Sequence, residues 1–352
     1  MSLMLKRRVQ QRLDHLTKPL GALGQLEALA LQVALVQGSE TPHWQAPQLL
    51  VFAADHGIAA QGVSAYPAAV TTQMVLNMLA GGAAVSVLAR QHGLALTVVD
   101  CGVLHDFAPQ PGLHIAKVCH GTADSSIGPA LSPGQCRRAI ANGRALVRSL
   151  PGNALLLGEM GIANTSAAAL LMCRLTGLPL TDCVGRGTGL DDVGLAHKTA
   201  VLQRALQCHA HVAGPVPLLA ALGGAEIATM VGAVLQAAEE RRVVVVDGFI
   251  TTAAVAVAAA MCEHALDVLH CCVFAHGSAE AGHGRWLAAL GVQTLLGSEL
   301  GLRLGEGSGA ALAWPLLVSA LKLLDEMASF ESASVSGPKE SQPTVNGFGD
   351  VA

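Results

Sequence analysis

Gln48-Leu49-Leu50-Val51-Phe52-Ala53-Ala54, followed at once by Asp55-His56-Gly57, is the stretch of this 352-residue chain that decides the fold. The block has the length of a strand, and it lacks the alternation of polar and apolar residues that a strand with one wet face shows. It therefore predicts a buried strand of a parallel sheet, with a functional loop at its carboxyl end.

The same order of strand, loop and helix recurs along the chain. Four more short apolar blocks, at residues 96–100, 154–157, 243–246 and 272–275, each end in a polar or glycine-containing turn. Ser132-Pro133 offers an N-cap with proline in the first helical turn, and it predicts a helix to about Leu150. Repeated units of this kind predict an α/β fold, a parallel sheet covered by helices on both faces.

The two ends of the chain lie outside this alternation. Apolar residues recur at helical spacing from Leu23 onward, and a long apolar helix is expected near the carboxyl end. We predict that residues 1–40 and about 310–331 form a small helical domain, that 41–309 form the α/β domain, and that 332–352 are a disordered tail.

The composition excludes several classes of protein. Hydrophobic residues make up 52% and charged residues 13% of the chain, which favours a large buried core and an oligomer interface over disorder. A net charge of -4 with scattered Lys and Arg argues against a nucleic-acid partner. The apolar stretches are shorter than the ~20 residues that a bilayer needs, and no signal peptide is visible. We therefore expect a cytoplasmic protein with no membrane partner.

The nine cysteines contain no C-x-x-C pair, which favours reduced core thiols over a zinc site. His276 and His283 have the wrong spacing for a zinc-binding helix, so polar positioning and capping are the preferred interpretation. No metal and no cofactor is predicted.

Polar side chains stand where the predicted strands end, and ligands bind at the carboxyl ends of strands in parallel sheets. These residues are Asp55, Asp100, Glu159, Asp247 and His276. Each alone is more often a cap or a turn former, but together they predict the rim of an active site.

Two glycine-containing loops have the composition of ligand-binding turns. Gly185-Arg186-Gly187-Thr188-Gly189 precedes a helix that carries Lys198, and successive backbone N–H groups in such a loop favour an anion such as phosphate. The second loop, at residues 158–165, carries Glu159 and offers Asn164 as a helix cap. The alternatives are a plain flexible loop, a structural ion pair for Glu159 and an ordinary surface lysine.

Glu306 lies between glycines in Leu304-Gly305-Glu306-Gly307-Ser308-Gly309. Apolar neighbours would desolvate its carboxylate, and desolvation raises a carboxyl pKa until the group is a usable base near neutral pH. The alternative is a solvated glutamate before a helix. Ser308 is displaced by one position from a hydrolase nucleophile elbow, so a hydrolase is discounted.

Together these loops closely resemble one family, the nicotinate-nucleotide–dimethylbenzimidazole phosphoribosyltransferases of cobalamin biosynthesis. The resembling motifs run in order from about residue 16 to about 325: Leu16-Thr17-Lys18-Pro19-Leu20-Gly21, Ala54-Asp55-His56-Gly57, Tyr66-Pro67, Val70-Thr71-Thr72-Gln73-Met74, Gly158-Glu159-Met160-Gly161-Ile162, Gly185-Arg186-Gly187-Thr188-Gly189-Leu190-Asp191-Asp192, Asp247-Gly248-Phe249, His276-Gly277-Ser278 and Leu302-Arg303-Leu304-Gly305-Glu306-Gly307-Ser308-Gly309. One departure is Ala163, which stands where relatives often have glycine.

The resemblance implies a Rossmann-like large domain, a small helical domain and a homodimer. It also implies transfer of ribose 5-phosphate from nicotinate mononucleotide to 5,6-dimethylbenzimidazole, with Glu306 as catalytic base and Glu159 as a second carboxylate. The predicted substrate-binding residues are Ser64, Tyr66, Gln73, Met74, Gly161, Asn164, Gly187, Thr188, Gly189, Lys198, Asp247, Ser278 and Leu304.

Two alternative functions remain open at this stage. A nucleotide-dependent oxidoreductase would need a G-x-G-x-x-G loop after the first strand, where Asp55-His56-Gly57 stands instead. A non-catalytic nucleotide- or vitamin-binding protein would keep the anion-binding loop and would have no need of Glu306.

Overall fold

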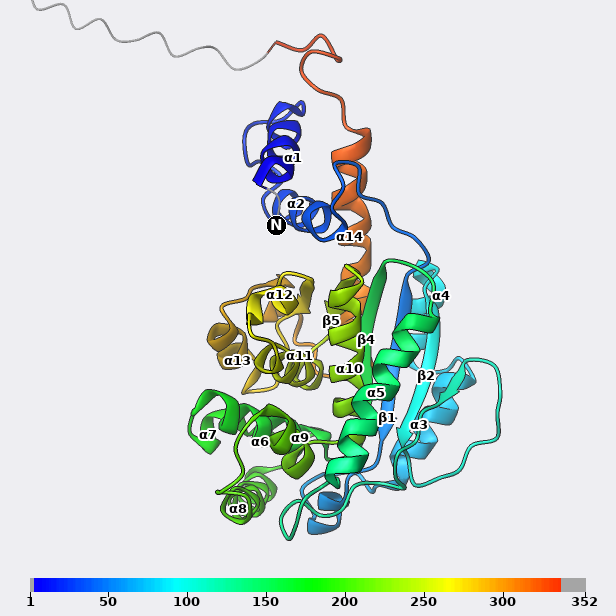
Figure 1. The fold of residues 1–352 in the computed structure, drawn as a ribbon, viewed down its shortest axis with the longest axis vertical. Coiled ribbons are helices and arrows are strands. Elements are labelled where there is room, and N and C mark those ends of the chain that lie inside the picture. The colour runs from blue at the N-terminus through cyan, green and yellow to red at the C-terminus, as the bar shows by residue number, and fades with distance from the viewer. Residues whose placement is uncertain (1–2, 337–352) are drawn as a thin grey trace, which may run out of the picture.

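The computed structural model describes residues 3–336 and contains one sheet of seven parallel strands (Figure 1). The strand order is β3-β2-β1-β4-β5-β6-β7. The strands are β1 Gln48–Ala54, β2 Ala95–Gly102, β3 Leu113–Ile115, β4 Ala154–Met160, β5 Val243–Val246, β6 Cys272–His276 and β7 Thr294–Leu296. The predicted α/β fold is confirmed. The edge strands β3 and β7 were not predicted, because three residues are too few to show a periodicity.

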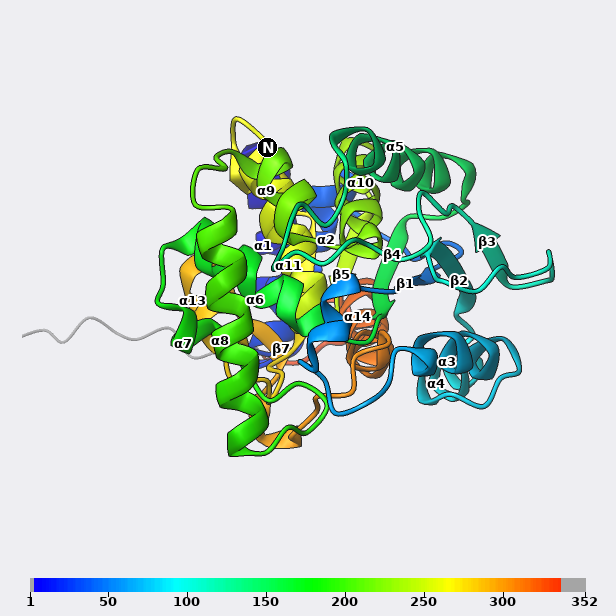
Figure 2. The same cartoon turned by 90° about the horizontal axis from the view of Figure 1, so that it is seen from below.

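Helices cover both faces of the sheet, as Figure 2 shows from below. They are α1 Leu3–His15, α2 Gln25–Gln37, α3 Ala69–Leu79, α4 Ala84–His92, α5 Pro133–Ser149, α6 Asn164–Thr176, α7 Leu180–Cys183, α8 Asp192–Cys208, α9 Pro215–Leu222, α10 Ala225–Glu239, α11 Phe249–Met261, α12 Ala265–Leu269, α13 His283–Leu290 and α14 Ser308–Glu326. The predicted start of α5 is confirmed, because Ser132 and Gln135 form a reciprocal capping box.

The uniform apolar character of β1 has a direct structural cause. Leu50 and Phe52 contribute to the core beneath α5, α6, α10 and α11, whereas Leu49 and Val51 contribute to the core beneath α2, α3, α4 and α14. Successive side chains point to opposite faces of a strand, so a strand covered on both sides must be apolar throughout. All seven residues of β1 are buried.

Helix α14 runs along the sheet from the carboxyl ends of the strands to their amino ends. It begins at Ser308, near the carboxyl end of β4, and runs back past Trp44, the residue four positions before β1. The Trp44 indole N–H donates to the Leu317 carbonyl at 3.1 Å, and its ring lies 4.9 Å from that of Trp314. This path places the turn that precedes α14 at the same end of the sheet as the carboxyl ends of the strands.

The first two helices and the last helix meet beyond the sheet, where α1 and α2 lie beside the last turns of α14 (Figure 1). The helices α2 and α14 also share the hydrophobic core of the adjoining sheet face. The division into a small helical domain and an α/β domain stays a prediction. Of the predicted tail, residues 337–352 lie outside the described residues, and Ser332 forms hydrogen bonds with Ser329.

Two segments are long and apolar enough to cross a membrane by composition alone, Ala69–His92 and Ser308–Glu326. The first is interrupted between α3 and α4, and the second packs against α2, α4, β4 and β6. Such packing is typical of a core helix. The last turns of helix α14 also contain the polar residues Lys322, Asp325 and Glu326.

Candidate active site

A cavity of about 650 Å³ opens at the carboxyl ends of β4, β5 and β6. Its lining comes from the loops that follow these strands, from the start of α3, and from the segment 301–306 before α14. Eleven of the predicted site residues line it: Tyr66, Met74, Glu159, Gly161, Asn164, Gly187, Thr188, Asp247, Ser278, Leu304 and Glu306. The position agrees with the rule that parallel sheets bind ligands at strand ends.

Four predicted site residues do not line the cavity themselves. Gln73 is exposed on α3, and Gly189 is exposed at the end of its loop. The Ser64 hydroxyl lies 3.3 Å from the hydroxyl of Thr188, which does line the cavity. Lys198 is fully buried on α8, where its ammonium group supports the loop from behind.

The turn that carries Glu306 is built from three consecutive residues with positive φ. These are Gly305 at 79°, Glu306 at 65° and Gly307 at 86°. Only glycine adopts such angles freely, so the strained Glu306 needs support from its surroundings. Asp247 at the end of β5 supplies it, because its carboxylate accepts the Ala310 N–H at 2.9 Å and the Gly307 N–H at 3.2 Å.

Glycines also allow the turn to approach the sheet. A side chain at Gly158 would meet the Glu306 carbonyl at 2.3 Å, and one at Gly305 would meet the Glu159 carboxylate at 2.2 Å. The turn therefore packs directly onto β4, which brings the carboxyl groups of Glu159, Asp247 and Glu306 into one small volume.

This crowding and burial perturb the three carboxyl groups. Burial, with a further contribution from the Asp247 charge, raises the pKa of Glu306 to about 7. Burial also raises the pKa of Glu159 to about 8, although Asn164 donates a hydrogen bond to its carboxylate. The pKa of Asp247 is raised by burial as well, against the opposing charge of His276. Near neutral pH, the cluster therefore exchanges protons.

Glu306 is the member of this cluster that remains available for chemistry. Its side chain is 6% exposed, and its Oε2 atom is buried with no hydrogen-bond partner among residues 3–336. Glu159 is held by Asn164, and Asp247 is held by the amides that begin α14. A carboxylate oxygen that is dehydrated and unpaired gains most from a ligand that donates a proton.

One wall of the cavity is apolar and partly open to solvent. Tyr66, Val70 and Met74 form it from the α3 side, and Leu304 forms it from the segment before α14. Tyr66 is 53% exposed and Leu304 is 58% exposed. Exposed large apolar side chains beside a cavity are suited to a flat apolar ligand.

The glycine loop, residues 185–189, contributes Gly187 and Thr188 to the cavity lining. The Lys198 ammonium group donates to the Thr165 hydroxyl at 2.9 Å and to the Gly185 carbonyl at 3.1 Å. Burial lowers the pKa of Lys198 to about 8, so the group still carries its charge for much of the time at neutral pH. This arrangement places a cation next to Gly187, because a Cβ atom added there would lie 3.4 Å from the ammonium nitrogen.

Two features of the site were not predicted from the sequence. Glu280 lines the cavity and accepts the Gly187 N–H at 3.2 Å, yet its sequence context had indicated only polar positioning. His56 and Glu226 form a buried ion pair of 2.7 Å beneath Gly161. Burial opposes charging of His56, but the Glu226 carboxylate outweighs this effect and the pKa of His56 rises. No local sequence signal joins residues that lie this far apart in the chain.

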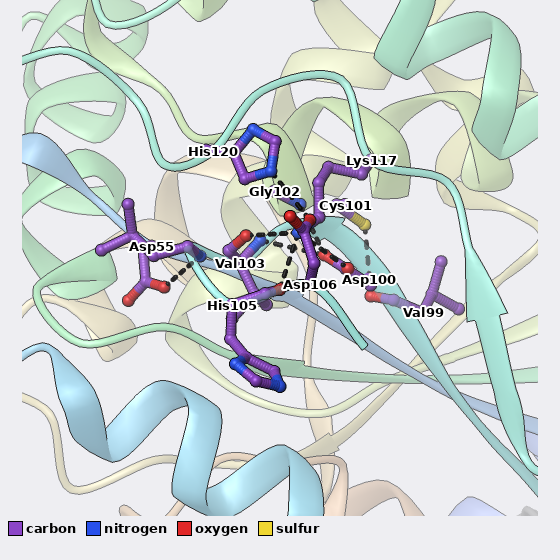
Figure 3. Close-up of polar contacts among 11 residues, drawn as sticks. Asp55, Val99, Asp100, Cys101, Gly102, Val103, His105, Asp106, Lys117 and His120 are labelled. Atoms are coloured by element: carbon purple, nitrogen blue, oxygen red, sulfur yellow. Dashed lines mark hydrogen bonds and ion pairs between the residues drawn. The ribbon is translucent and has the colours of Figure 1, made fainter. Parts of the chain in front are cut away.

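The polar residues at the ends of β1 and β2 do not line the cavity. Asp100 accepts the Gly102 and Val103 N–H groups, and Lys117 lies 3.4 Å from its carboxylate. Asp55 accepts the Leu104 N–H at 2.8 Å. Figure 3 shows these aspartates around the loop after β2, where they hold the backbone. The predicted rim is therefore confined to β4, β5 and β6.

Across residues 3–336, no group of three or more His, Cys, Asp and Glu side chains is arranged to hold a metal ion. The expectation that no metal is required stays a prediction. The nine cysteines are all free thiols in the structure.

Comparisons with known proteins identify the family. A phosphoribosyltransferase family model matches residues 1–335. The nicotinate-nucleotide–dimethylbenzimidazole phosphoribosyltransferase of Variovorax paradoxus is 64% identical over 332 residues, which is 94% of each chain. The protein of the same name from Dechloromonas aromatica is 55% identical, over 94% of this chain and 96% of that one.

Solved structures agree with the sequence relatives. The crystal structure of CobT from Thermus thermophilus matches with a TM-score of 0.89 at 42% identity, and the match covers 95% of this chain and 99% of that chain. A second structure from the same organism, described as the dimethylbenzimidazole phosphoribosyltransferase, matches with a TM-score of 0.90 over 96% of this chain and 100% of that chain. The chain therefore belongs to the phosphoribosyltransferase family.

Proposed function

We propose that this protein transfers ribose 5-phosphate from nicotinate mononucleotide to 5,6-dimethylbenzimidazole, in assembly of the cobalamin nucleotide loop. The products are α-ribazole 5'-phosphate and nicotinate. The relatives that cover almost the whole chain carry this activity in their names. The observation that carries the proposal is the buried and unpaired oxygen of Glu306 in a cavity with one apolar wall.

The reaction needs little help with its leaving group. Nicotinate bound to ribose is a pyridinium, so the electron pair of the breaking C1'–N bond neutralises that positive charge and no general acid is required. Positive charge then develops at C1' of the ribose. Those of the neighbouring carboxyl groups of Glu159, Asp247 and Glu306 that are ionised give the site a negative potential that stabilises this charge.

The acceptor needs a base. A ring nitrogen of dimethylbenzimidazole attacks C1' from the face opposite to the leaving group, which converts a β-linkage into an α-linkage. As the new C1'–N bond forms, the other ring N–H becomes acidic, and Glu306 accepts its proton. A pKa of about 7 suits this role, because a base with such a pKa is ionised yet still basic at the working pH.

The two substrates are expected to contact different parts of the cavity lining. We place the dimethylbenzimidazole ring against Tyr66, Met74 and Leu304, and the nucleotide phosphate on the loop at Gly187 and Thr188 in front of Lys198. Glu159 is then near the ribose, where it binds a hydroxyl group or assists as a second carboxylate. Holding the two reactants in line supplies much of the acceleration.

We also expect a cytoplasmic homodimer. The low content of charged residues, 13%, and the exposed apolar side chains at the cavity mouth support an additional buried interface. Light scattering of the purified protein at several concentrations tests this expectation, and a monomer at all concentrations contradicts it.

The activity is tested by incubating the protein with nicotinate mononucleotide and a panel of bases, namely benzimidazoles, purines and phenols. Mass spectrometry of the products is expected to detect a ribosylated benzimidazole and an equal amount of nicotinate. NMR of the product then assigns the anomer. Absence of a ribosylated product with every base contradicts the proposed function, and a β-linked product contradicts the inversion.

A further inference from the structure

The glycine loop that we assign to phosphate already holds an anion of the protein itself. The Gly187 N–H, which lies at the centre of residues 185–189, donates to the Glu280 carboxylate at 3.2 Å. Gly185 lies against the same carboxylate so closely that a Cβ atom there would be 1.9 Å from Oε1. Glu280 is 9% exposed and lines the cavity.

The backbone of Glu280 is fixed independently of this contact. Its N–H donates to the Ser278 hydroxyl at 3.3 Å, and its carbonyl accepts the His283 N–H that begins α13. The one hydrogen bond of the carboxylate within residues 3–336 is the bond from Gly187. The side chain can therefore leave the loop by rotation of its own torsions, without a change in the fold.

A carboxylate and a phosphate compete for the same donors. Both accept backbone N–H groups in turns of this kind, and both are attracted by the Lys198 ammonium group behind the loop. They also repel each other, so a phosphate and the Glu280 carboxylate cannot share the Gly187 N–H. Binding of a phosphorylated ligand is thus an exchange of one anion for another.

We propose that Glu280 is a specificity-determining residue that occupies the phosphate position of the empty site and is displaced when the nucleotide phosphate binds. The inference rests on the proposed function in one respect, the placement of the phosphate on this loop. Glu280 keeps the loop in its binding conformation while the site is empty, and it limits how much the phosphate contributes to affinity.

The prediction separates ligands with a phosphate from ligands without one. In Glu280→Ala, inorganic phosphate and nicotinate mononucleotide are expected to bind about tenfold more tightly, which corresponds to about 1.4 kcal/mol. Nicotinate riboside lacks the phosphate and leaves Glu280 in place, so its dissociation constant is expected to change less than about twofold. Glu280→Gln keeps the shape and loses the charge, and an intermediate gain is expected.

Glu299→Ala is the matched control. Glu299 is an exposed acid in the short 3₁₀ helix Ser298–Leu300, and its substitution removes the same charge without touching the glycine loop. Isothermal titration with all three ligands measures the effects. Weaker phosphate binding in Glu280→Ala, or equal changes for nucleotide and riboside, overturns the proposal. A gain of the same size in Glu299→Ala also overturns it, because net charge would then explain the effect.

The unaltered protein gives a second test that does not depend on folding of a variant. Crystals grown with and without inorganic phosphate are expected to differ in the separation of the Glu280 carboxylate from the Gly187 nitrogen, with the hydrogen bond lost when phosphate occupies the loop. Phosphate bound there with the hydrogen bond intact overturns the proposal. If phosphate exchanges with Glu280 but no ribosylated product forms in the mass assay, the proposed function fails and this inference stands.

Discussion

The carboxyl ends of β1 and β2 and the carboxyl ends of β4 and β5 look alike in sequence and differ in chemistry. At each place an apolar strand ends in an acidic residue. At the ends of β1 and β2, Asp55 and Asp100 accept loop N–H groups, and Lys117 lies beside Asp100. At the ends of β4 and β5, the acidic groups of Glu159 and Asp247 crowd a third, Glu306, and no lysine or arginine pairs with them among the described residues.

The difference teaches where a carboxyl group becomes reactive. Burial raises the pKa of Asp100, but Lys117 and the Gly102 and Val103 N–H groups oppose this rise and hold the carboxyl group in one place. Crowding of buried carboxyl groups without a cation leaves their charged forms unstable, and such groups take up protons near neutral pH. Lys117 lies beside Asp100, and among residues 3–336 no lysine or arginine pairs with Glu159 or Glu306, which distinguishes the structural region from the candidate active site.

The largest effect is expected for Glu306→Gln, which removes the proposed base and keeps the shape of the turn. Turnover is expected to fall by about 10²–10⁴-fold, while binding of nicotinate mononucleotide changes little. Steady-state rates and titration of the nucleotide measure the two effects separately. Unchanged turnover would rule out Glu306 as the base. It would also remove the contrast between the ends of β1 and β2 and the ends of β4 and β5.

Asp247→Asn tests the coupling within the crowded region. The amide removes the charge that helps to raise the pKa of Glu306, so the acid limb of kcat/KM is expected to move to lower pH. Only one oxygen remains to accept the Gly307 and Ala310 N–H groups, and a looser turn is expected to lower kcat about tenfold. A pH profile identical to that of the unaltered protein would show that the two carboxyl groups act independently.

The fold could be predicted from local patterns because those patterns have local causes. The strand β1 is apolar after Gln48 because both of its faces are buried. The start of α5 is set by the capping box of Ser132 and Gln135, which lies within four residues. The site could be predicted in part for the same reason. Glycines on both sides of Glu306 indicate a turn that only glycine-rich sequence adopts, and the structure places that turn against β4.

The remaining features depend on contacts between distant segments. Glu280 meets Gly187 across 93 positions of sequence, and Glu226 meets His56 across 170. Asp100 and Glu159 lie near the carboxyl ends of similar apolar strands, and contacts with distant residues, Lys117 for the first and Asp247 for the second, separate their roles. Ala163 is a further case, because its φ of 76° is an angle that glycine adopts freely, and only the structure gives that angle.

The free energy of unfolding should depend on pH through the ionisation of Glu306, and Glu306→Gln again provides the test. The native pKa of Glu306 is about 7 against a usual value of 4.5, so the folded protein binds this proton more tightly than the unfolded chain. The resulting stabilisation is complete below about pH 4.5 and is lost as the pH rises through 7. Glutamine does not titrate, so the variant is expected to gain a few degrees in Tm over the unaltered protein at pH 8 and less at pH 5. Calorimetry at both pH values measures the gain, and a constant difference in Tm would contradict the assignment.

The smallest effect on activity is expected for Asp100→Asn in the structural region. The amide keeps one acceptor for the Gly102 and Val103 N–H groups and loses the charge that faces Lys117. Because Asp100 is fully buried, the free energy of unfolding is expected to fall by about 1–3 kcal/mol. Urea unfolding measures this loss. The kcat/KM of the folded variant and its pH profile are expected to match those of the unaltered protein, since the charge lost at the end of β2 is not among those that set the pKa of Glu306. A shifted pH profile would mean that the charge of Asp100 influences the carboxyl groups at the ends of β4 and β5. The presence of Lys117 would then no longer explain why only one of the two regions is reactive.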